Sequence, residues 1–205
     1  MESAPRSSFS QNADARMRII NSDGSEAEMC GNGIRCLARY FFDRAEGANR
    51  RIETIAGVIE TAVVSAQPFL VRINVGPPVF LHGAPLFDNA DVLTVGNPHA
   101  VVFVESAADA DLLALGARAP HLNVHAVSAS AGALDVRHHE RGAGLTQACG
   151  TGSAAAAIAA IRRGIARSPV TVRVPGGELL VEWDGTSDAF LTGPAEPVFD
   201  ATIRS

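Results

Sequence analysis

Two cysteines in this sequence stand in the same local pattern. Cys30 and Cys149 each begin a C-G-x-G tetrapeptide, and apolar residues at helical spacing follow in 34–42 and 154–161. This periodicity predicts that each cysteine lies at the start of a helix. There, the unpaired N–H groups and the positive end of the helix dipole favour a thiolate, and the glycines let an anion approach the backbone. The repeat therefore predicts two activated thiols and two anion-binding turns that share one site.

The amino-acid composition excludes several kinds of chemistry. All 17 basic residues are arginine, so no lysine can form a Schiff base with pyridoxal phosphate or complete a Walker A phosphate loop. No cofactor is therefore expected, and the protein's own groups must do the chemistry. The three cysteines are an odd number and show no C-x-x-C spacing, which argues against a secreted disulfide framework and a structural zinc site. No metal is expected.

Charge and hydropathy narrow the choice of partners. The net charge of -5 argues against nucleic acid. No apolar run is long enough to cross a bilayer, and the first residues lack the basic and apolar regions of a signal peptide. We expect a cytoplasmic protein with a small-molecule substrate and no membrane partner.

The hydrophobic pattern predicts many short strands and few helices. Strands are expected at 17–20, 52–55, 58–64, 69–75, 101–104, 123–129, 133–137, 170–174, 179–183 and 189–192. Helices are expected after each cysteine and at 107–118, with a crossing segment at 79–91.

The order of these elements predicts a two-lobed molecule. A strand, a cysteine helix and three further strands occur twice along the chain. The simplest fold is α+β, with two pseudo-symmetric lobes, each a mixed or antiparallel sheet around a central helix. We expect a first lobe from 1–75 with 194–205, a second lobe from 76–193, and the cysteine helices meeting between them.

The residues around each cysteine resemble the two signatures of the diaminopimelate epimerase family. The first stretch runs from Asn21 to Cys36 (NSDGSEAEMCGNGIRC) and the second from Glu140 to Gly152 (ERGAGLTQACGTG). Shorter matches are G-N-P-H at 96–99, the strand that begins at Asn123, and P-G-G at 175–177. The resemblance implies the family's two-lobed fold and a cofactor-independent interconversion of LL- and meso-diaminopimelate, on the pathway to lysine and peptidoglycan.

The resemblance also implies roles for particular residues. Cys30 and Cys149 would be the base and the acid, with roles that exchange with the direction of reaction. His99 and Glu140 would tune the thiol pKa values, although His99 is also explained as a structural histidine. The substrate-binding positions that the family implies are Asn21, Gly31, Asn32, Asn97, Asn123, Glu140, Arg141, Gly150 and Thr151. An arginine suits a carboxylate and a glutamate an ammonium, which are the two groups of an amino-acid substrate.

The chemistry of inversion fits this pair of cysteines. Inverting an amino-acid Cα requires a base on one face of the carbon and an acid on the other. Without pyridoxal phosphate, the developing carbanion must be stabilised through the substrate carboxylate, held against fixed donors. The backbone N–H groups just after each cysteine are placed for this, and such preorganised donors are usually the largest catalytic term.

Other residues with reactive side chains have ordinary structural interpretations. Cys36, which follows the first signature cysteine by six residues, is predicted to be a small apolar core residue. His121, His138 and His139 are predicted to be surface residues with no role. Asp23 is explained equally well as a turn residue and as part of the site.

The sequence also departs from the family at its beginning. Family members open with a G-N-D-F motif on a hairpin, followed by a helix and a strand that carries a glutamine, and residues 1–15 match none of this. The first lobe is therefore expected to lack substrate contacts and paired strands. Its exposed sheet edges would invite aggregation or pairing with another chain, for which a homodimer is one outcome.

Three other functions stay open. The chain could be an inactive remnant or a module that binds an amino acid without turning it over. It could be a proline-type racemase, although those relatives have histidine after C-G, where this chain has Asn32. A redox dithiol protein is the third hypothesis, because two close thiols can form a disulfide.

Overall fold

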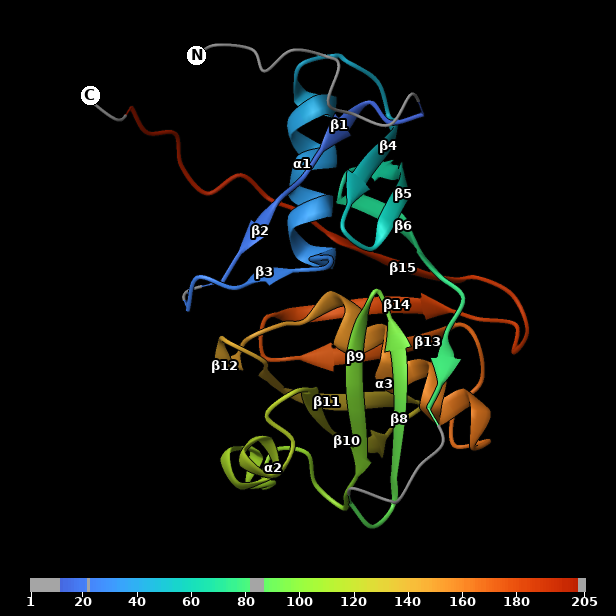
Figure 1. The fold of residues 1–205 in the computed structure, drawn as a ribbon. Helices are drawn as coiled ribbons and strands as arrows, with labels where there is room; N and C mark the ends of the chain where they lie inside the picture. Colours follow the sequence, from blue (N-terminus) through green and yellow to red (C-terminus); the bar gives the residue numbers. More distant parts are fainter. Residues whose placement is uncertain (1–11, 22, 82–86, 203–205) are drawn as a thin grey trace.

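The computed structural model describes residues 12–21, 23–81 and 87–202, which form two lobes, one above the other in Figure 1. The first lobe contains β1 (Ala15–Arg16), β2 (Ile19–Ile20), β3 (Glu26–Ala27), α1 (Gly31–Asp43), β4 (Asn49–Thr54), β5 (Gly57–Ala66) and β6 (Phe69–Gly76). The second lobe contains β7 (Val79–Phe80), β8 (Ala90–Val95), β9 (Asn97–Phe103), α2 (Leu112–Arg118), β10 (Asn123–Ser130), β11 (Ala133–Glu140), β12 (Gly144–Thr146), α3 (Gly150–Arg162), β13 (Val170–Val174) and β14 (Gly177–Glu182). The last strand, β15 (Ala189–Pro194), lies between the lobes.

One sheet runs through both lobes. Its strand order is β1-β4-β5-β6-β15-β14-β13-β11-β10-β9-β8-β7, and β12 adds to β11 at the side. β15 pairs antiparallel with β6 of the first lobe and with β14 of the second. The division into two lobes at 75/76 and 193/194 stays a prediction. β15 is hydrogen-bonded to a strand of each lobe.

The second lobe encloses its central helix. α3 packs against β8, β9, β10, β11, β13, β14 and β15. Eleven of its 13 residues are buried, because the run Ala154–Ala157 presents small side chains in every direction. Short side chains let strands approach a helix from all sides, so α3 forms the centre of this lobe's core.

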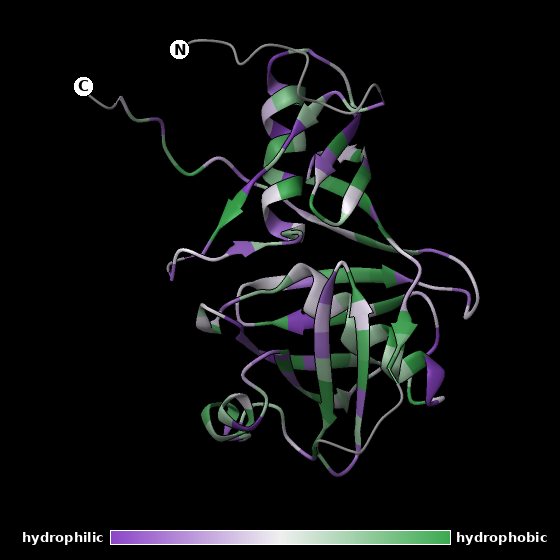
Figure 2. Ribbon diagram, viewed as in Figure 1, coloured by the Kyte–Doolittle hydropathy of each residue, from purple (hydrophilic) through white to green (hydrophobic). Residues whose placement is uncertain are grey.

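The first lobe covers its helix on one side. α1 packs against β4, β5 and β6 through Ile34 and Ala38, which are one turn apart, and hydrophilic residues occupy other parts of its surface (Figure 2). Tyr40 is 48% exposed. Cys36 lies on the same uncovered side and is exposed, so its prediction as a core residue is wrong. A residue two positions from Ile34 and from Ala38 points away from the face that they share.

The expected fold class is confirmed, and some elements differ in extent. A cysteine helix followed by three strands occurs twice, as α1-β4-β5-β6 and α3-β13-β14-β15. The helix expected at 107–118 begins only at Leu112, because the Asp111 side chain caps it by accepting from the Ala114 N–H at 3.0 Å. The segment 79–91 contains β7 and the start of β8. No helix of the described ranges is long and apolar enough to cross a membrane.

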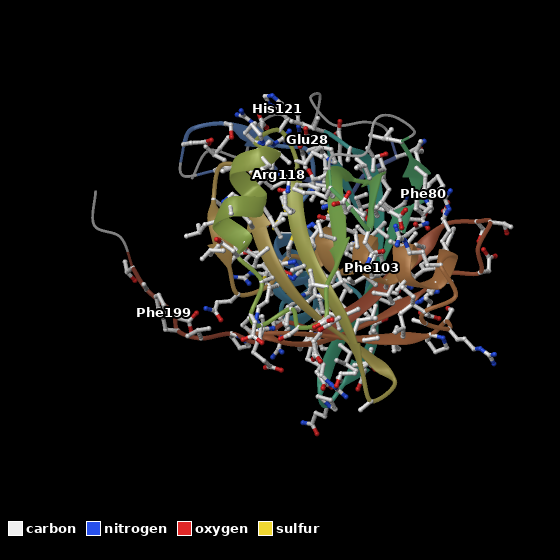
Figure 3. All side chains as sticks on the ribbon, turned by 90° about the horizontal axis from the view of Figure 1, so that it is seen from below. Glu28, Phe80, Phe103, Arg118, His121 and Phe199 are labelled. Carbon is white, nitrogen blue, oxygen red and sulfur yellow. The ribbon has the colours of Figure 1, made fainter. Side chains whose placement is uncertain are left out.

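After Ala195, which is still buried, the chain leaves the body of the protein. The segment that carries Phe199 runs outward, away from both lobes (Figures 1 and 3). Val198 and Phe199 are 88% and 81% exposed. These two side chains therefore add nothing to the core of either lobe.

Candidate active site

The N-termini of α1 and α3 meet backbone to backbone between the lobes. A Cβ added to Gly31 would lie 3.2 Å from the Cα of Gly150, and one added to Gly150 would lie 3.0 Å from the Cα of Gly31. A side chain at either position would push the helices apart, which explains the glycines. The positive ends of two helices and their unpaired N–H groups therefore converge.

Cys30 and Cys149 are the N-cap residues of these helices. The Gly33 N–H donates to the Cys30 sulfur at 3.3 Å, and the Gly152 N–H donates to the Cys149 sulfur at 3.4 Å. Both cysteines are free and line one cavity of about 90 Å³. The two cysteines thus line the same space from opposite lobes.

The cavity brings together most of the predicted site residues. Those that line it are Asn21, Cys30, Gly31, Asn32, Asn97, Asn123, Glu140, Arg141, Cys149, Gly150 and Thr151. His99 is the predicted site residue that does not line it; it is fully buried.

The environment of Cys149 favours the thiol form of its side chain. The residue is 4% exposed, and burial raises the pKa of its thiol well above the usual value, with the Glu140 carboxylate as the second cause. Hydrogen bonds from Gly152 and Thr151 act in the opposite direction but are weaker. At this helix N-terminus desolvation therefore outweighs the dipole, which favours the thiolate. Glu140 is itself held by Thr146, whose hydroxyl donates to it at 2.5 Å.

Asparagine side chains fix the cavity wall. The Asn97 amide donates to the Met29 carbonyl at 2.8 Å and to the Thr151 hydroxyl at 3.2 Å. Its oxygen is buried and has no hydrogen-bond partner among the described residues. Such an acceptor on a cavity wall suits a donor such as an ammonium group.

Two further asparagines join separate parts of the chain. The Asn32 amide of the first lobe donates to the Ala148 carbonyl of the second at 3.0 Å. Asn123 accepts from the Arg141 N–H at 2.9 Å and donates to the Pro98 carbonyl at 3.2 Å. These bonds fix the positions of backbone segments that border the cavity.

A buried arginine lies behind the two helix ends. Arg35 is 6% exposed, and burial lowers the pKa of its guanidinium. It donates at 3.1 Å to three acceptors, the Gly31 carbonyl, the Asn32 side chain and the Pro194 carbonyl. Within the described ranges no carboxylate forms an ion pair with it. A buried cation without an anion beside two helix N-termini favours the binding of an anion in the cavity.

Sequence reasoning missed Arg35, and a signal for it existed. It lies next to Ile34 and one turn after Gly31, on the face of α1 that packs. A charged residue at the edge of an apolar stripe indicates a buried charge with a specific task.

An ion pair connects the lobes at the rim of the site. Arg141 of the second lobe contacts both carboxylate oxygens of Glu28 in the first, at 3.0 and 2.8 Å. The loop at Gly142 also passes close to Asp23, because a Cβ on Gly142 would lie 2.6 Å from its carboxylate. Hydrogen bonds from Ser25 lower the pKa of Asp23. Asp23 is thus a turn residue that also touches the opposite lobe, whereas Glu28 had no predicted role.

The histidines differ from expectation. His121 is exposed, but His138 is 1% exposed, so its prediction as a surface residue is wrong. Successive side chains of a strand point to opposite faces, so His138 and His139 cannot both face solvent on β11. His139 packs on Gly116 of α2, and His138 contacts His125 in the core. In the described ranges, no group of three or more His, Cys, Asp or Glu is arranged to hold a metal ion.

Comparison with known proteins identifies close and distant relatives. The family model described as diaminopimelate epimerase matches residues 7–81 and 92–198. A diaminopimelate epimerase of Desulfitobacterium hafniense is 38% identical over 95% of this chain and 79% of its own length, and one of Stutzerimonas stutzeri is 40% identical over 93% and 79%.

Solved structures share the fold at low identity. A predicted epimerase of Pseudomonas aeruginosa has a TM-score of 0.70 and 16% identity, over 91% of this chain and 80% of that one. A hydroxyproline epimerase of Agrobacterium vitis, solved with trans-4-hydroxy-L-proline, has a TM-score of 0.70 and 15% identity, over 90% and 69%. At these identities the two structures support the fold and leave the substrate open.

Proposed function

This chain belongs to the diaminopimelate epimerase family, and on that basis we propose that it interconverts LL- and meso-diaminopimelate by a two-cysteine acid/base mechanism, in the formation of lysine and peptidoglycan precursors. The observation that carries the mechanism is the pair of N-cap cysteines, one from each lobe, that line a single cavity where two helix N-termini meet.

The geometry supports a division of labour between sulfur and backbone. One cysteine removes the Cα proton from one face of the substrate, and the other delivers a proton to the opposite face. The substrate carboxylate lies against the first-turn N–H groups of α1 and α3, which have no partner within their helices. Because negative charge grows on this carboxylate as the proton leaves, these donors and the buried Arg35 stabilise the carbanion more than the substrate.

The burial of Cys149 supports an assignment of the resting proton. Its raised thiol pKa makes Cys149 the acid in the resting enzyme and leaves Cys30 as the base. In the reverse direction Cys149 must give up its proton, and the neighbouring Glu140 carboxylate is placed to take and hold that proton. We assign His99 the same tuning role for the thiol pKa values, which it would exert from behind the cavity wall.

Hydrogen exchange tests this function. In deuterated water the wild-type chain should incorporate deuterium at the Cα of diaminopimelate as the two isomers interconvert. Cys30→Ala and Cys149→Ala should each lower the rate by about 10²–10⁴-fold, which is the usual contribution of one acid or base. Cys36→Ala is the matched control, because this third cysteine is exposed on the far side of α1.

Other outcomes identify the alternatives. Binding of diaminopimelate to the wild-type chain without exchange would show an amino-acid-binding module. Exchange at a proline-type substrate alone would show a racemase of that class. Exchange that survives both cysteine replacements would rule out the two-thiol mechanism.

We also propose a cytoplasmic, dimeric enzyme. The three free cysteines fit a reducing compartment. The first lobe exposes Tyr40, Ile55 and Val64, which a second copy could cover. Analytical ultracentrifugation should give twice the monomer mass, and Val64→Asp should lower it if the pairing uses this lobe.

A further inference from the structure

A layer of histidines lies directly behind the cavity wall of the second lobe. Asn123 of β10 lines the cavity, and two residues farther along the same face of the strand comes His125. His125 is in register with His138 of β11, and Asn123 is in register with His99 of β9. The three histidines therefore follow the polar wall as the next layer inward.

Hydrogen bonds connect the three rings. His99 Nδ1 lies 2.8 Å from His125 Nε2, and His125 Nδ1 lies 2.8 Å from His138 Nδ1. All three are 0 or 1% exposed, and burial lowers the pKa of His99 and of His138 to about 3. Each ring is therefore neutral at physiological pH and carries one N–H.

Only two proton arrangements satisfy both hydrogen bonds with neutral rings. In the first, His138 donates from Nδ1 to His125, His125 donates from Nε2 to His99, and His99 carries its N–H at Nε2. In the second, His99 donates from Nδ1 to His125, His125 donates from Nδ1 to His138, and His99 Nε2 is a free acceptor. A change between them takes up one proton at the Nε2 of one end and releases one from the Nε2 of the other. The tautomers of the three rings are thus tied together.

The layer is costly as a purely structural core. The Nε2 atom of His138 is buried and has no hydrogen-bond partner among the described residues, whereas the His99 ring lies near the Val95 carbonyl, which opposes the lowering of its pKa. A buried polar group without a hydrogen-bond partner lowers the stability of the fold, whereas the next paired position along β10 and β11 is filled by Val127 and Val136. A group retained at such a cost calls for an explanation.

The layer of histidines also contacts the first turn of α3, the helix that Cys149 caps. A Cβ on Gly152 would lie 2.4 Å from the His125 ring, so the ring packs directly on this glycine. Gly152 is the residue whose N–H donates to the Cys149 sulfur. Movement of the His125 ring would therefore move a donor of the thiol.

We propose that His125 and His138 are positioning residues for the epimerisation: they fix the tautomer that His99 presents behind the site and hold the first turn of α3 under Cys149. The proposal rests on the proposed function. Of the three histidines, His99 lies nearest the cavity wall. The presence of a proton at its Nε2 is therefore set by His125 and His138, which do not line the cavity.

The direct test is nitrogen NMR of the full chain labelled with ¹⁵N-imidazole histidine, which distinguishes the two tautomers of each ring. In the wild type, the three rings should show one of the two arrangements. His138→Gln keeps an amide that can hydrogen-bond His125 but cannot exchange tautomer, and it should shift the tautomer populations of both His125 and His99. His139→Gln is the matched control, because this neighbour on β11 faces α2, and it should leave them unchanged.

Kinetics of the same variants test the consequence. His138→Gln should lower kcat for epimerisation by about tenfold or more with little change in KM, because a misplaced proton partner affects proton transfer rather than binding. His138→Phe should lower kcat at least as much, and its folding is checked by the dispersion of the same spectra.

The outcomes separate this proposal from the function on which it rests. A His99 tautomer that does not respond to His138→Gln overturns the coupling, and so does wild-type kcat in that variant. A wild-type chain that binds diaminopimelate without exchange refutes the proposed function, while the NMR arm still decides whether the rings are coupled.

Discussion

The helices behind Cys30 and Cys149 begin with the same cap and then differ in everything around them. Both have 13 residues, both N-cap cysteines are extended, with φ of -131° and -125°, and both sulfurs accept an N–H from the residue three positions on. Yet four residues of α1 are buried and eleven of α3. The cap therefore positions each sulfur, whereas the surrounding lobe determines how far the helix is buried and, for Cys149, how high the thiol pKa is.

Equivalent positions show how the difference arises. Where α1 has Cys36 and Tyr40, both exposed, α3 has Ala155 and Ala159, both fully buried. The second lobe wraps strands around all sides of its helix, so small residues fill most of its positions, whereas the first lobe leaves one side free. Burial then raises the thiol pKa of Cys149.

Apart from the cysteines themselves, the largest expected effect comes from Arg35, whose equivalent in α3 is the buried Ala154. Arg35→Gln should lower kcat/KM by about 10- to 100-fold, because a charge-assisted hydrogen bond contributes about 1.5–3 kcal/mol and this cation backs the anion site. Steady-state kinetics measures it, and Arg35→Lys should restore part of the loss.

Arg39→Gln is the matched control for this prediction. Arg39 lies one turn farther along α1 and donates to the Ala195 carbonyl, next to the carbonyl that Arg35 holds. If both variants lose activity equally, the tether to the chain after β15 matters and the charge at the helix ends does not.

A leucine introduced at equivalent positions of the two helices tests the difference in packing. Ala155→Leu should lower the free energy of unfolding by about 1–3 kcal/mol, because the core around α3 has no room for the added carbons. Cys36→Leu should change it by less than about 0.5 kcal/mol, since that side chain lies in solvent. Urea unfolding gives both values, and equal losses would mean that α1 is covered in solution.

The sequence predicted the caps better than the surroundings. The repeated C-G-x-G located both helix starts because capping depends on a few adjacent residues. Burial depends on strands far away in the chain, and so Cys36 was placed in the core and His138 at the surface, both wrongly. Glu28 was missed for the same reason, because its partner Arg141 lies 113 residues away. Arg35 was missed although its place beside the apolar stripe of α1 was a local signal.

Alkylation measures the difference in thiol state directly. At neutral pH, Cys149 should react with iodoacetamide at least about tenfold more slowly than Cys36, because the thiolate fraction falls tenfold for each unit that the pKa lies above the pH. The Cys149 rate should keep rising as the solution is made more alkaline, since its thiol loses the proton only there. Peptide mass spectrometry follows each cysteine separately.

Glu140→Gln sharpens this measurement. It removes the second cause of the raised pKa while burial remains, so Cys149 should react faster than in the wild type but still more slowly than Cys36. A Cys149 that reacts faster than Cys36 in the wild-type chain would contradict the assignment of Cys149 as the resting acid.

The smallest expected effect lies at the rim, where the lobes are joined by partly exposed charges. Glu28→Gln removes the carboxylate that holds Arg141, and both side chains are about a third exposed, at 35% and 33%. An ion pair of this kind contributes about 0.2–1 kcal/mol, so KM for diaminopimelate should rise by no more than about fivefold, with kcat nearly unchanged. The effect should shrink further at high salt, which screens exposed charges. A large fall in kcat instead would mean that the Glu28–Arg141 pair contributes to the chemical step and not only to substrate binding.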